Sequence, residues 1–288
     1  MRAPMITPFF LDSAGGRIFC TAFHSGPRPG PGPGLLFLPP WAEEANKARR
    51  MMARLGHALA ESGFTTLVPD LFGTGDSHGD FSEARWPIWL RNAADARAWL
   101  REWCGGPVYA GGLRLGALLA LEAARDFKDP PAGFLLWSPV TNGQQALKQF
   151  LRLRLAAGMG MGGDQVRETT RELQDRLDAG ETLEVAGYEL HPELAGALAD
   201  RSLKDLPPPK GADVHWLDLV SGPDAGPPPA SRTVVEAWSA QDAHVHQETV
   251  AGEHFWATQE LVDVPDLIES SRDTLAGYDN AEPSAPIL

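Results

Sequence analysis

Two glycines separated by three residues enclose the position where this chain is most expected to do chemistry. The segment reads Gly112-Leu113-Arg114-Leu115-Gly116, and it follows Val108 to Ala110, a short apolar run that predicts a buried strand. Glycines on both sides let a strand turn sharply into a helix and hold the central side chain exposed in a strained backbone conformation. The pattern is typical of a nucleophile elbow, whose central residue is usually serine, but here that residue is Arg114.

A histidine and an aspartate follow later predicted strands. His254 comes directly after the last of these strands, and Asp224 lies in the loop after the predicted strand Val214 to Val220. Ligands of open parallel sheets bind beyond the carboxyl ends of the strands, so both residues are expected near Arg114. We predict that His254 is a general base and that Asp224 holds its ring in the required tautomer. Asp218, within the strand, is the alternative acid.

Two further loops follow predicted parallel strands. The first reads Pro39-Pro40-Trp41-Ala42-Glu43-Glu44. Proline has no backbone N–H, so Trp41 or Ala42 is expected to give one hydrogen bond to an oxyanion, and Leu115, after the elbow, the other. The second loop, Asp70 to Ser77, has glycines that favour a tight turn over a phosphate cradle, and we expect it to shape the rim of the site.

An arginine at the elbow closes the usual route through a covalent acyl-enzyme. Arg114 stays protonated and carries only donors, so it cannot attack a carbonyl, but its fork can bind an anion at the start of a helix. The anion is either a substrate carboxylate or phosphate, or the side chain of Glu43 or Glu44, which would plug the pocket. Ser138 and Ser77 are the nearest substitute nucleophiles by loop position, although both are also typical turn residues.

Apolar runs alternate with helical patterns along most of the chain. Ile6 to Leu11 and Arg17 to Phe23, separated by Ala14-Gly15-Gly16, predict a β-hairpin. The apolar runs that follow are typical of parallel strands buried on both faces, and helix-length segments separate them. One such helix is expected to run from an N-cap at Ser82 to Trp103. The fold class is therefore α/β, with a mostly parallel, doubly wound sheet.

The region from Asn142 to Leu206 departs from this alternation. Two helical runs, Gln144 to Ala157 and Gln165 to Leu177, flank a break at Gly158 to Gly163, and no buried strand is expected. We interpret this region as an inserted helical cap. The predicted division is a core of residues 1–141 and 207–280, a cap of residues 142–206 and a tail of residues 281–288.

Composition excludes several classes of protein. The 288 residues include 25 Lys and Arg against 38 Asp and Glu, a net charge of −13 that argues against nucleic-acid binding. Cys20 and Cys104 are too few for a disulfide framework or a thiolate zinc site, and neither metal nor cofactor is expected. No apolar run predicts stable membrane insertion, and the basic helical segment Leu147 to Leu155 is expected to pack over the site mouth. Without a signal-peptide pattern, a cytoplasmic protein is expected.

The order of elbow, acid and histidine along the chain is that of the α/β hydrolases. On these residues the sequence resembles that superfamily from Ile6 to Tyr278. More narrowly, the segment Pro39 to Met51, the loop Asp70 to Ser77 and the elbow resemble the type-two hydrolase associated with the exosortase A system. This resemblance implies an α/β-hydrolase fold and a link to exopolysaccharide and protein-sorting loci, whose proteins are candidate partners. It brings no known substrate.

Two functions of different classes are consistent with these residues. The first is hydrolysis of a small ester-like or acyl substrate linked to envelope polysaccharide, with Arg114 as anion clamp, His254 as base, Asp224 as orienting acid and oxyanion donors near Trp41 and Leu115. The second is a catalytically inactive ligand-binding or scaffold pseudoenzyme that keeps the pocket. A cofactor-free lyase or transferase on the same fold is a third alternative.

Overall fold

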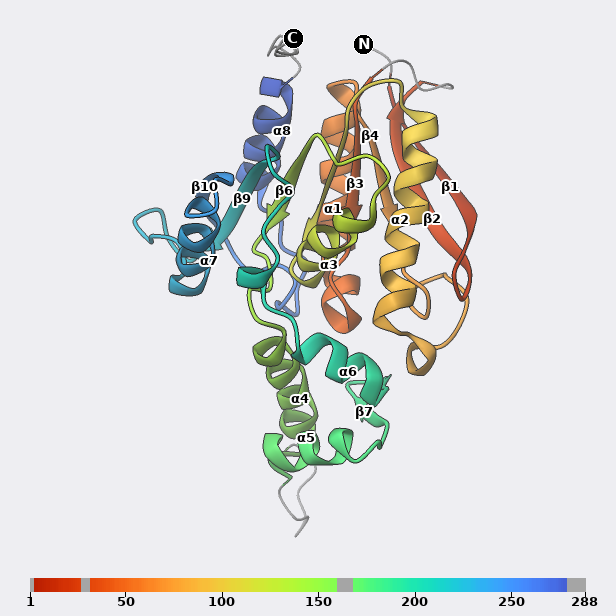
Figure 1. Ribbon diagram of the computed structural model, residues 1–288, viewed down its shortest axis with the longest axis vertical. Coiled ribbons are helices and arrows are strands. Elements are labelled where there is room, and N and C mark those ends of the chain that lie inside the picture. Colours follow the sequence, from red (N-terminus) through yellow and green to blue (C-terminus); the bar gives the residue numbers. More distant parts are fainter. Residues whose placement is uncertain (1–2, 27–31, 160–167, 279–288) are drawn as a thin grey trace.

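The computed structural model of the chain describes residues 3–26, 32–159 and 168–278. Within them, an eight-stranded sheet has the order β1-β2-β4-β3-β5-β6-β9-β10 (Figure 1). The strands are β1 (Pro4–Ser13), β2 (Gly16–Ser25), β3 (Gly34–Leu38), β4 (Thr65–Pro69), β5 (Val108–Leu113), β6 (Gly133–Trp137), β9 (Asp213–Val220) and β10 (His244–Ala251).

The direction of the strands confirms the predicted fold class. β1 and β2 form an antiparallel hairpin, in which Ser13 pairs with Gly16 and Gly15 takes a positive φ of 82° at the turn. β2 is also antiparallel to β4, whereas every other neighbouring pair in the sheet is parallel. Parallel strands need crossover connections, which the helices between them provide.

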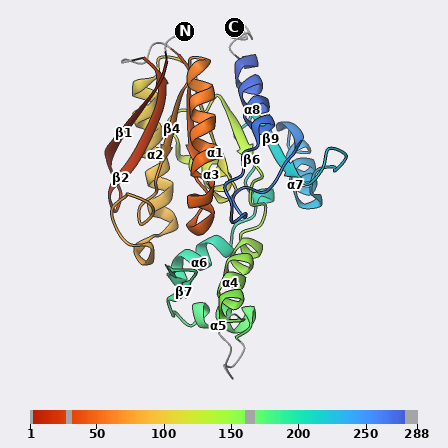
Figure 2. The same ribbon diagram turned by 180° about the vertical axis from the view of Figure 1, so that it is seen from behind.

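Helices cover both faces of the sheet. Figure 2 shows α1 (Ala42–Glu61) and α8 (Pro265–Tyr278) on one face. Figure 1 shows α2 (Trp86–Trp103), α3 (Leu115–Ala123) and α7 (Pro229–Ser239) on the other. All five residues of β3 and all five of β6 are buried, as expected for central strands covered on both sides. An apolar cluster lies on each face, and together they position the carboxyl ends of the strands.

The cap lies beyond the carboxyl ends of the central strands (Figure 1). It contains α4 (Gly143–Met159), α5 (Thr170–Asp178), β7 (Leu183–Val185), β8 (Tyr188–Leu190), α6 (Pro192–Ala199) and the 3-10 turn η3 (Leu203–Asp205). The expectation that this region holds no buried strand is wrong, because β7 and β8 pair as an antiparallel hairpin in which Leu183, Val185 and Leu190 are buried. Strands of three residues are too short to show a period-2 pattern, so the sequence carries no clear signal for them.

The start of α2 differs from the expected one. The helix predicted to start at Ser82 is divided: a 3-10 turn η1 (Phe81–Glu83) is capped by Asp80, and α2 begins at Trp86 after an N-cap at Arg85. Pro87 explains the later start, because proline fits the first turn of a helix but not its interior. Most of the break predicted at residues 158–163, the start of the run predicted at 165–177, and the tail at 281–288 lie outside the described residues.

Candidate active site

The predicted elbow is a sharp turn between β5 and α3. Arg114, its central residue, has a φ of 55° and a ψ of −116°, a conformation that is unusual for a residue with a side chain. A Cβ atom on Gly116 would lie 2.2 Å from the Leu38 carbonyl oxygen, and one on Gly112 would lie 2.5 Å from the Gly116 carbonyl carbon. Glycine is therefore required at both positions by the backbone that surrounds the turn.

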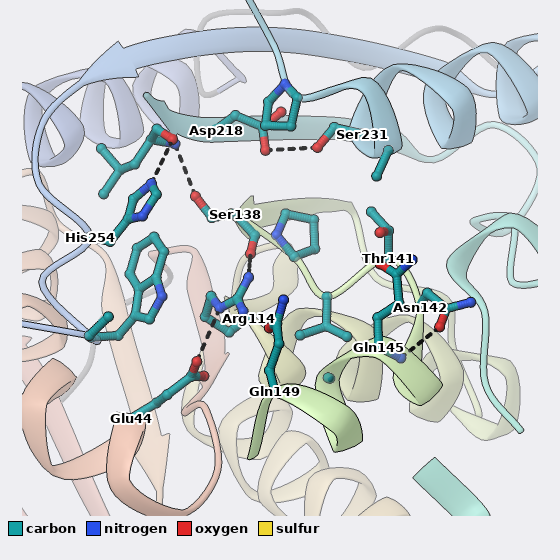
Figure 3. A pocket seen from close by; sticks show the side chains of 18 residues that line it. Glu44, Arg114, Ser138, Thr141, Asn142, Gln145, Gln149, Asp218, Ser231 and His254 are labelled. Carbon is teal, nitrogen blue, oxygen red and sulfur yellow. Dashed lines mark hydrogen bonds and ion pairs between the residues drawn. The ribbon is translucent and has the colours of Figure 1, made fainter. Parts of the chain in front are cut away.

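The side chain of Arg114 points into a cavity beneath the cap (Figure 3). Its Nε lies 3.4 Å from Glu44 Oε1, and its Nη1 donates a hydrogen bond of 3.3 Å to the Ser138 carbonyl oxygen. The guanidinium carbon also lies 5.3 Å from the centre of the Trp256 ring, within range of a cation–π contact. Arg114 is thus held by the Glu44 carboxylate, the Ser138 carbonyl oxygen and the Trp256 ring.

Glu44, rather than Glu43, is the partner of Arg114. Both glutamates lie in the first turn of α1, but Glu43 pairs instead with Lys47, four residues on, at 2.8 Å. The side chain of Glu44 is 27% exposed as a whole, whereas its Oε2 atom is fully buried and has no hydrogen-bond partner among the described residues. Burial raises the pKa of the Glu44 carboxyl, and the charge of Arg114 opposes that shift.

His254 reaches the same cavity from the loop after β10. Its Nε2 lies 3.2 Å from the Leu219 carbonyl oxygen. A carbonyl only accepts hydrogen bonds, so Nε2 must carry the proton, and in the neutral ring Nδ1 is then the basic nitrogen. The imidazole is stacked on the Trp256 ring with a centroid distance of 4.9 Å. Trp256 therefore contacts both His254 and Arg114.

The two candidate acids lie in different surroundings. Asp224 is exposed in the loop after β9 and does not line the cavity. Asp218, within β9, is 2% exposed, lines the cavity and accepts hydrogen bonds from Ser231 at 3.0 Å and Gln247 at 3.1 Å. Burial raises the pKa of the Asp218 carboxyl, and these hydrogen bonds oppose the shift. The structure brings Asp218, and not Asp224, to the cavity that holds His254.

The serines considered as substitute nucleophiles also differ. Ser138 follows β6 with a φ of 38°, lines the cavity, and accepts a 2.9 Å hydrogen bond on Oγ from the Leu219 N–H. Ser77 instead ties its loop to the sheet: its Oγ donates to the Asp70 carbonyl oxygen and accepts from the Phe19 N–H. None of residues 70–77 lines the cavity, so the expectation that this loop shapes its rim is wrong.

Two helices begin next to Arg114: α3 directly after it in the chain, and α1 at Ala42, two residues before its ion-pair partner Glu44. Leu115 is the first residue of α3, where an N–H has no acceptor within its own helix. Trp41 is the N-cap of α1, and Ala42 after it has a φ of 49°. The Trp41 side chain lines a second, smaller hollow next to Arg114.

The hollows adjoin at the ion pair. We call the larger one the main cavity, with a volume of about 460 Å³, and the smaller one the side chamber, with a volume of about 190 Å³. Residues from the core and from α4 line both of them: Glu44, Arg114, Val140, Ala146, Gln149, Trp256 and Ala257. Sequence reasoning missed Trp256 and Gln149, of which only Trp256, two residues after His254, had a positional signal.

Comparisons with known proteins place the chain in a family. The family model described as X-Pro dipeptidyl-peptidase (S15 family) matches residues 26–204. The chain belongs to the S15 family. In this S15 chain the matched part contains Glu44, Arg114 and all but the end of the cap, whereas His254 lies beyond it. A search of curated protein sequences gave no match.

Solved structures support the fold of this S15 protein. Est1E from Butyrivibrio proteoclasticus, solved with ferulic acid, is 16% identical with a TM-score of 0.65, over 95% of this chain and 100% of that one. Carboxyl esterase 2 from Tuber melanosporum is 12% identical with a TM-score of 0.59, over 96% and 85%. A proposed α/β hydrolase from Agrobacterium tumefaciens is 14% identical with a TM-score of 0.59, over 96% and 100%. The fold is that of an α/β hydrolase.

The described residues of this S15 chain also bear on metal binding and on membrane insertion. Among the described residues, no group of three or more His, Cys, Asp or Glu side chains is arranged to hold a metal ion. No helix in the described ranges combines the length and the apolar character that a membrane span requires.

Proposed function

We propose that this S15 protein hydrolyses ester-like or acyl substrates without a side-chain nucleophile at its elbow. Family and fold both support a hydrolase in general. One observation carries the finer proposal: Arg114 and His254 line one cavity at the carboxyl ends of the strands, and both contact Trp256. A base and an anion-binding group are thus present where ligands of such sheets bind.

In the proposed reaction, water is the nucleophile. His254 Nδ1 takes a proton from the water as its oxygen bonds to the substrate carbonyl carbon. The tetrahedral intermediate then collapses, the bond to the leaving oxygen breaks, and the proton passes to that oxygen to give an acid and an alcohol. The Leu219 carbonyl holds the ring by accepting from Nε2–H, as an acid does in a triad. In this proposed reaction the carbonyl takes the orienting role that the sequence analysis assigned to Asp224.

Stabilisation of the oxyanion is assigned to the backbone and to Arg114. The N–H of Leu115, together with that of Trp41 or Ala42, is proposed to donate to the carbonyl oxygen as it becomes negative. The Arg114 guanidinium is proposed to bind an anion of the reaction, either the carboxylate that hydrolysis releases or a carboxylate or phosphate of the substrate, and this anion competes with Glu44 for it. Such a substrate would open the ion pair that separates the main cavity from the side chamber.

A panel of acyl esters and thioesters tests the proposal. We expect turnover by the purified protein, and we expect His254→Ala to lower kcat by about 10²–10⁴-fold, the usual effect of removing a general base. His244→Ala is the matched control, because that side chain is 69% exposed and lies outside both hollows. No turnover by the wild type would contradict the proposal and favour a binding or scaffold pseudoenzyme, whereas equal turnover by His254→Ala would contradict the assignment of His254 as the base.

The resemblance to the exosortase-associated type extends the proposal to a biological setting. We propose that the acyl substrate belongs to exopolysaccharide metabolism and that proteins of such a locus are partners. Acylated oligosaccharides from an exopolysaccharide of this kind should then be hydrolysed faster than simple esters of the same acyl group. Equal rates on both would remove the support for this link.

A further inference from the structure

The side chamber differs in chemistry from the main cavity. Three aromatic or aliphatic side chains line it and do not line the main cavity: Trp41, Phe150 and Leu153. The rings of Trp41 and Phe150 are 4.5 Å apart, and both side chains are buried. The charged side chains that complete its lining, Glu43 and Lys47, neutralise each other in an ion pair of 2.8 Å. The side chamber therefore has an apolar wall, and the charged residues that line it alone are paired with each other.

The main cavity offers polar groups. Its own lining includes the hydroxyls of Ser138, Thr141 and Ser231 and the amides of Asn142 and Gln145. These groups donate and accept hydrogen bonds, so they suit a hydroxyl-rich or otherwise polar part of a ligand. Figure 3 shows them arranged along the side of the cavity away from Glu44.

Size separates the two hollows as well. The main cavity, at about 460 Å³, falls in the range of about 300–1,000 Å³ that is usual for small-molecule sites. The side chamber, at about 190 Å³, falls below that range, so it can hold only a small part of a ligand. Arg114 and Glu44 line both hollows, and a group that spans them passes the guanidinium.

We infer that the side chamber binds a short apolar acyl group, and that the substrate is an ester of such a group with a polar, hydroxyl-bearing alcohol that occupies the main cavity. This inference rests on the proposed function, which makes the reaction a hydrolysis. The scissile carbonyl then lies beside Arg114 and the N–H groups at the start of α1 and α3. Hydrolysis leaves the carboxylate of the acid next to the guanidinium with its chain in the chamber.

Chain length is the first test. Calorimetry measures the binding of acetate, butyrate, hexanoate and octanoate, and rate assays measure kcat/KM for glycerol esters of the same acids. Each methylene that enters an apolar chamber is expected to strengthen binding and raise kcat/KM by about fourfold until the chamber is full. Equal binding and equal kcat/KM along the series would overturn the inference.

Variants of Leu153 locate the effect. This side chain is 39% exposed on α4, so substitutions there are expected to fold. Leu153→Trp should fill the chamber and shorten the preferred chain, and Leu153→Ala should lengthen it. Ala156→Trp, on an exposed position of the same helix outside both hollows, is the matched control and should leave the preference unchanged. A preference that Leu153→Trp and Leu153→Ala do not shift would overturn the inference.

The two assays separate this inference from the proposed function. Chain-dependent binding of the acids that Leu153→Trp abolishes, with no hydrolysis of any ester, would support the chamber assignment and contradict the proposed hydrolysis. Hydrolysis that depends on His254 but not on chain length would support the proposed function and overturn the chamber assignment.

Discussion

Removing only the cation of the Arg114–Glu44 pair should destabilise the protein. Arg114→Met keeps much of the side-chain length but leaves Glu44 without its partner. At the Nε–Oε1 distance of 3.4 Å and an effective dielectric constant of about 20, two unit charges attract by about 5 kcal/mol. Arg114 is 20% exposed and loses hydration of its own in the pair, so we expect a net loss of about 1–2 kcal/mol in the free energy of unfolding.

The sign of the pH dependence follows from Glu44. Burial raises the pKa of its carboxyl above the unfolded value, so the protonated form is favoured in the folded state. The stability from this group is fully present below the unfolded pKa and falls as pH rises through the folded pKa. Arg114→Met raises that pKa further, so its cost should be largest at about pH 8 and small at about pH 4, where the carboxyl is neutral.

A double-mutant cycle measures the coupling. Urea unfolding of the wild type, Arg114→Met, Glu44→Gln and the double variant at about pH 8 should give a coupling energy of about 1–2 kcal/mol, with the double variant close to the wild type in stability. The pair of Glu43 and Lys47, four residues apart on α1 and 39% and 26% exposed, is varied as Glu43→Gln and Lys47→Met for comparison, and it should couple by the about 0.3–0.5 kcal/mol usual for such helical pairs. Equal coupling in the two pairs, or a cost of Arg114→Met that does not change with pH, would refute this reasoning.

Three further predictions concern other groups. Arg114→Ser should create a nucleophile, seen by mass spectrometry as a fluorophosphonate adduct at position 114 that the wild type lacks; no adduct would mean that His254 cannot activate that serine. Asp224→Asn should change kcat by less than about twofold, because the Leu219 carbonyl already holds His254, whereas a loss of about 10²-fold or more would restore Asp224 as the orienting acid. Burial and the neighbouring His246 lower the pKa of His215 to about 4, so its neutral form contributes stability above the unfolded pKa that is lost as pH falls through the folded value. In urea unfolding, the free energy of unfolding of His215→Gln should therefore fall less on acidification than that of the wild type, by on the order of 1–3 kcal/mol. An equal fall in both proteins would contradict this prediction.

Local backbone constraints made the frame of the site predictable. The elbow could be read from Gly112 and Gly116 because backbone atoms of the same turn and of Leu38 exclude a Cβ at both places. The hairpin and the buried central strands followed from alternation and apolar runs, which are properties of short segments. The position of His254 after the last strand followed from the same pattern, together with the rule that parallel strands present their carboxyl ends at one edge.

Contacts between distant segments were not predictable in this way. The pattern proposed either Glu43 or Glu44 for Arg114, and only the rotation of α1 against the elbow, 70 residues away, decides for Glu44. The partner of His254 is the Leu219 carbonyl oxygen. Every residue has such an oxygen, so the sequence does not mark this one as a partner. Asp218 and Asp224 are equivalent by residue type, yet packing buries the first and leaves the second in solvent.

An α/β fold, a strained turn with a cation at its centre and a histidine at the same edge of the sheet were all predictable from the residues alone. These features depend on the backbone conformations and the apolar patterns of short segments, which neighbouring residues encode. Three features became visible in the folded chain and not before: the cation pairs with Glu44, a carbonyl oxygen contacts the imidazole, and α4 of the cap helps to line both a polar cavity and an apolar chamber. Those features depend on how elements far apart in the chain pack together, and packing is a property of the whole fold.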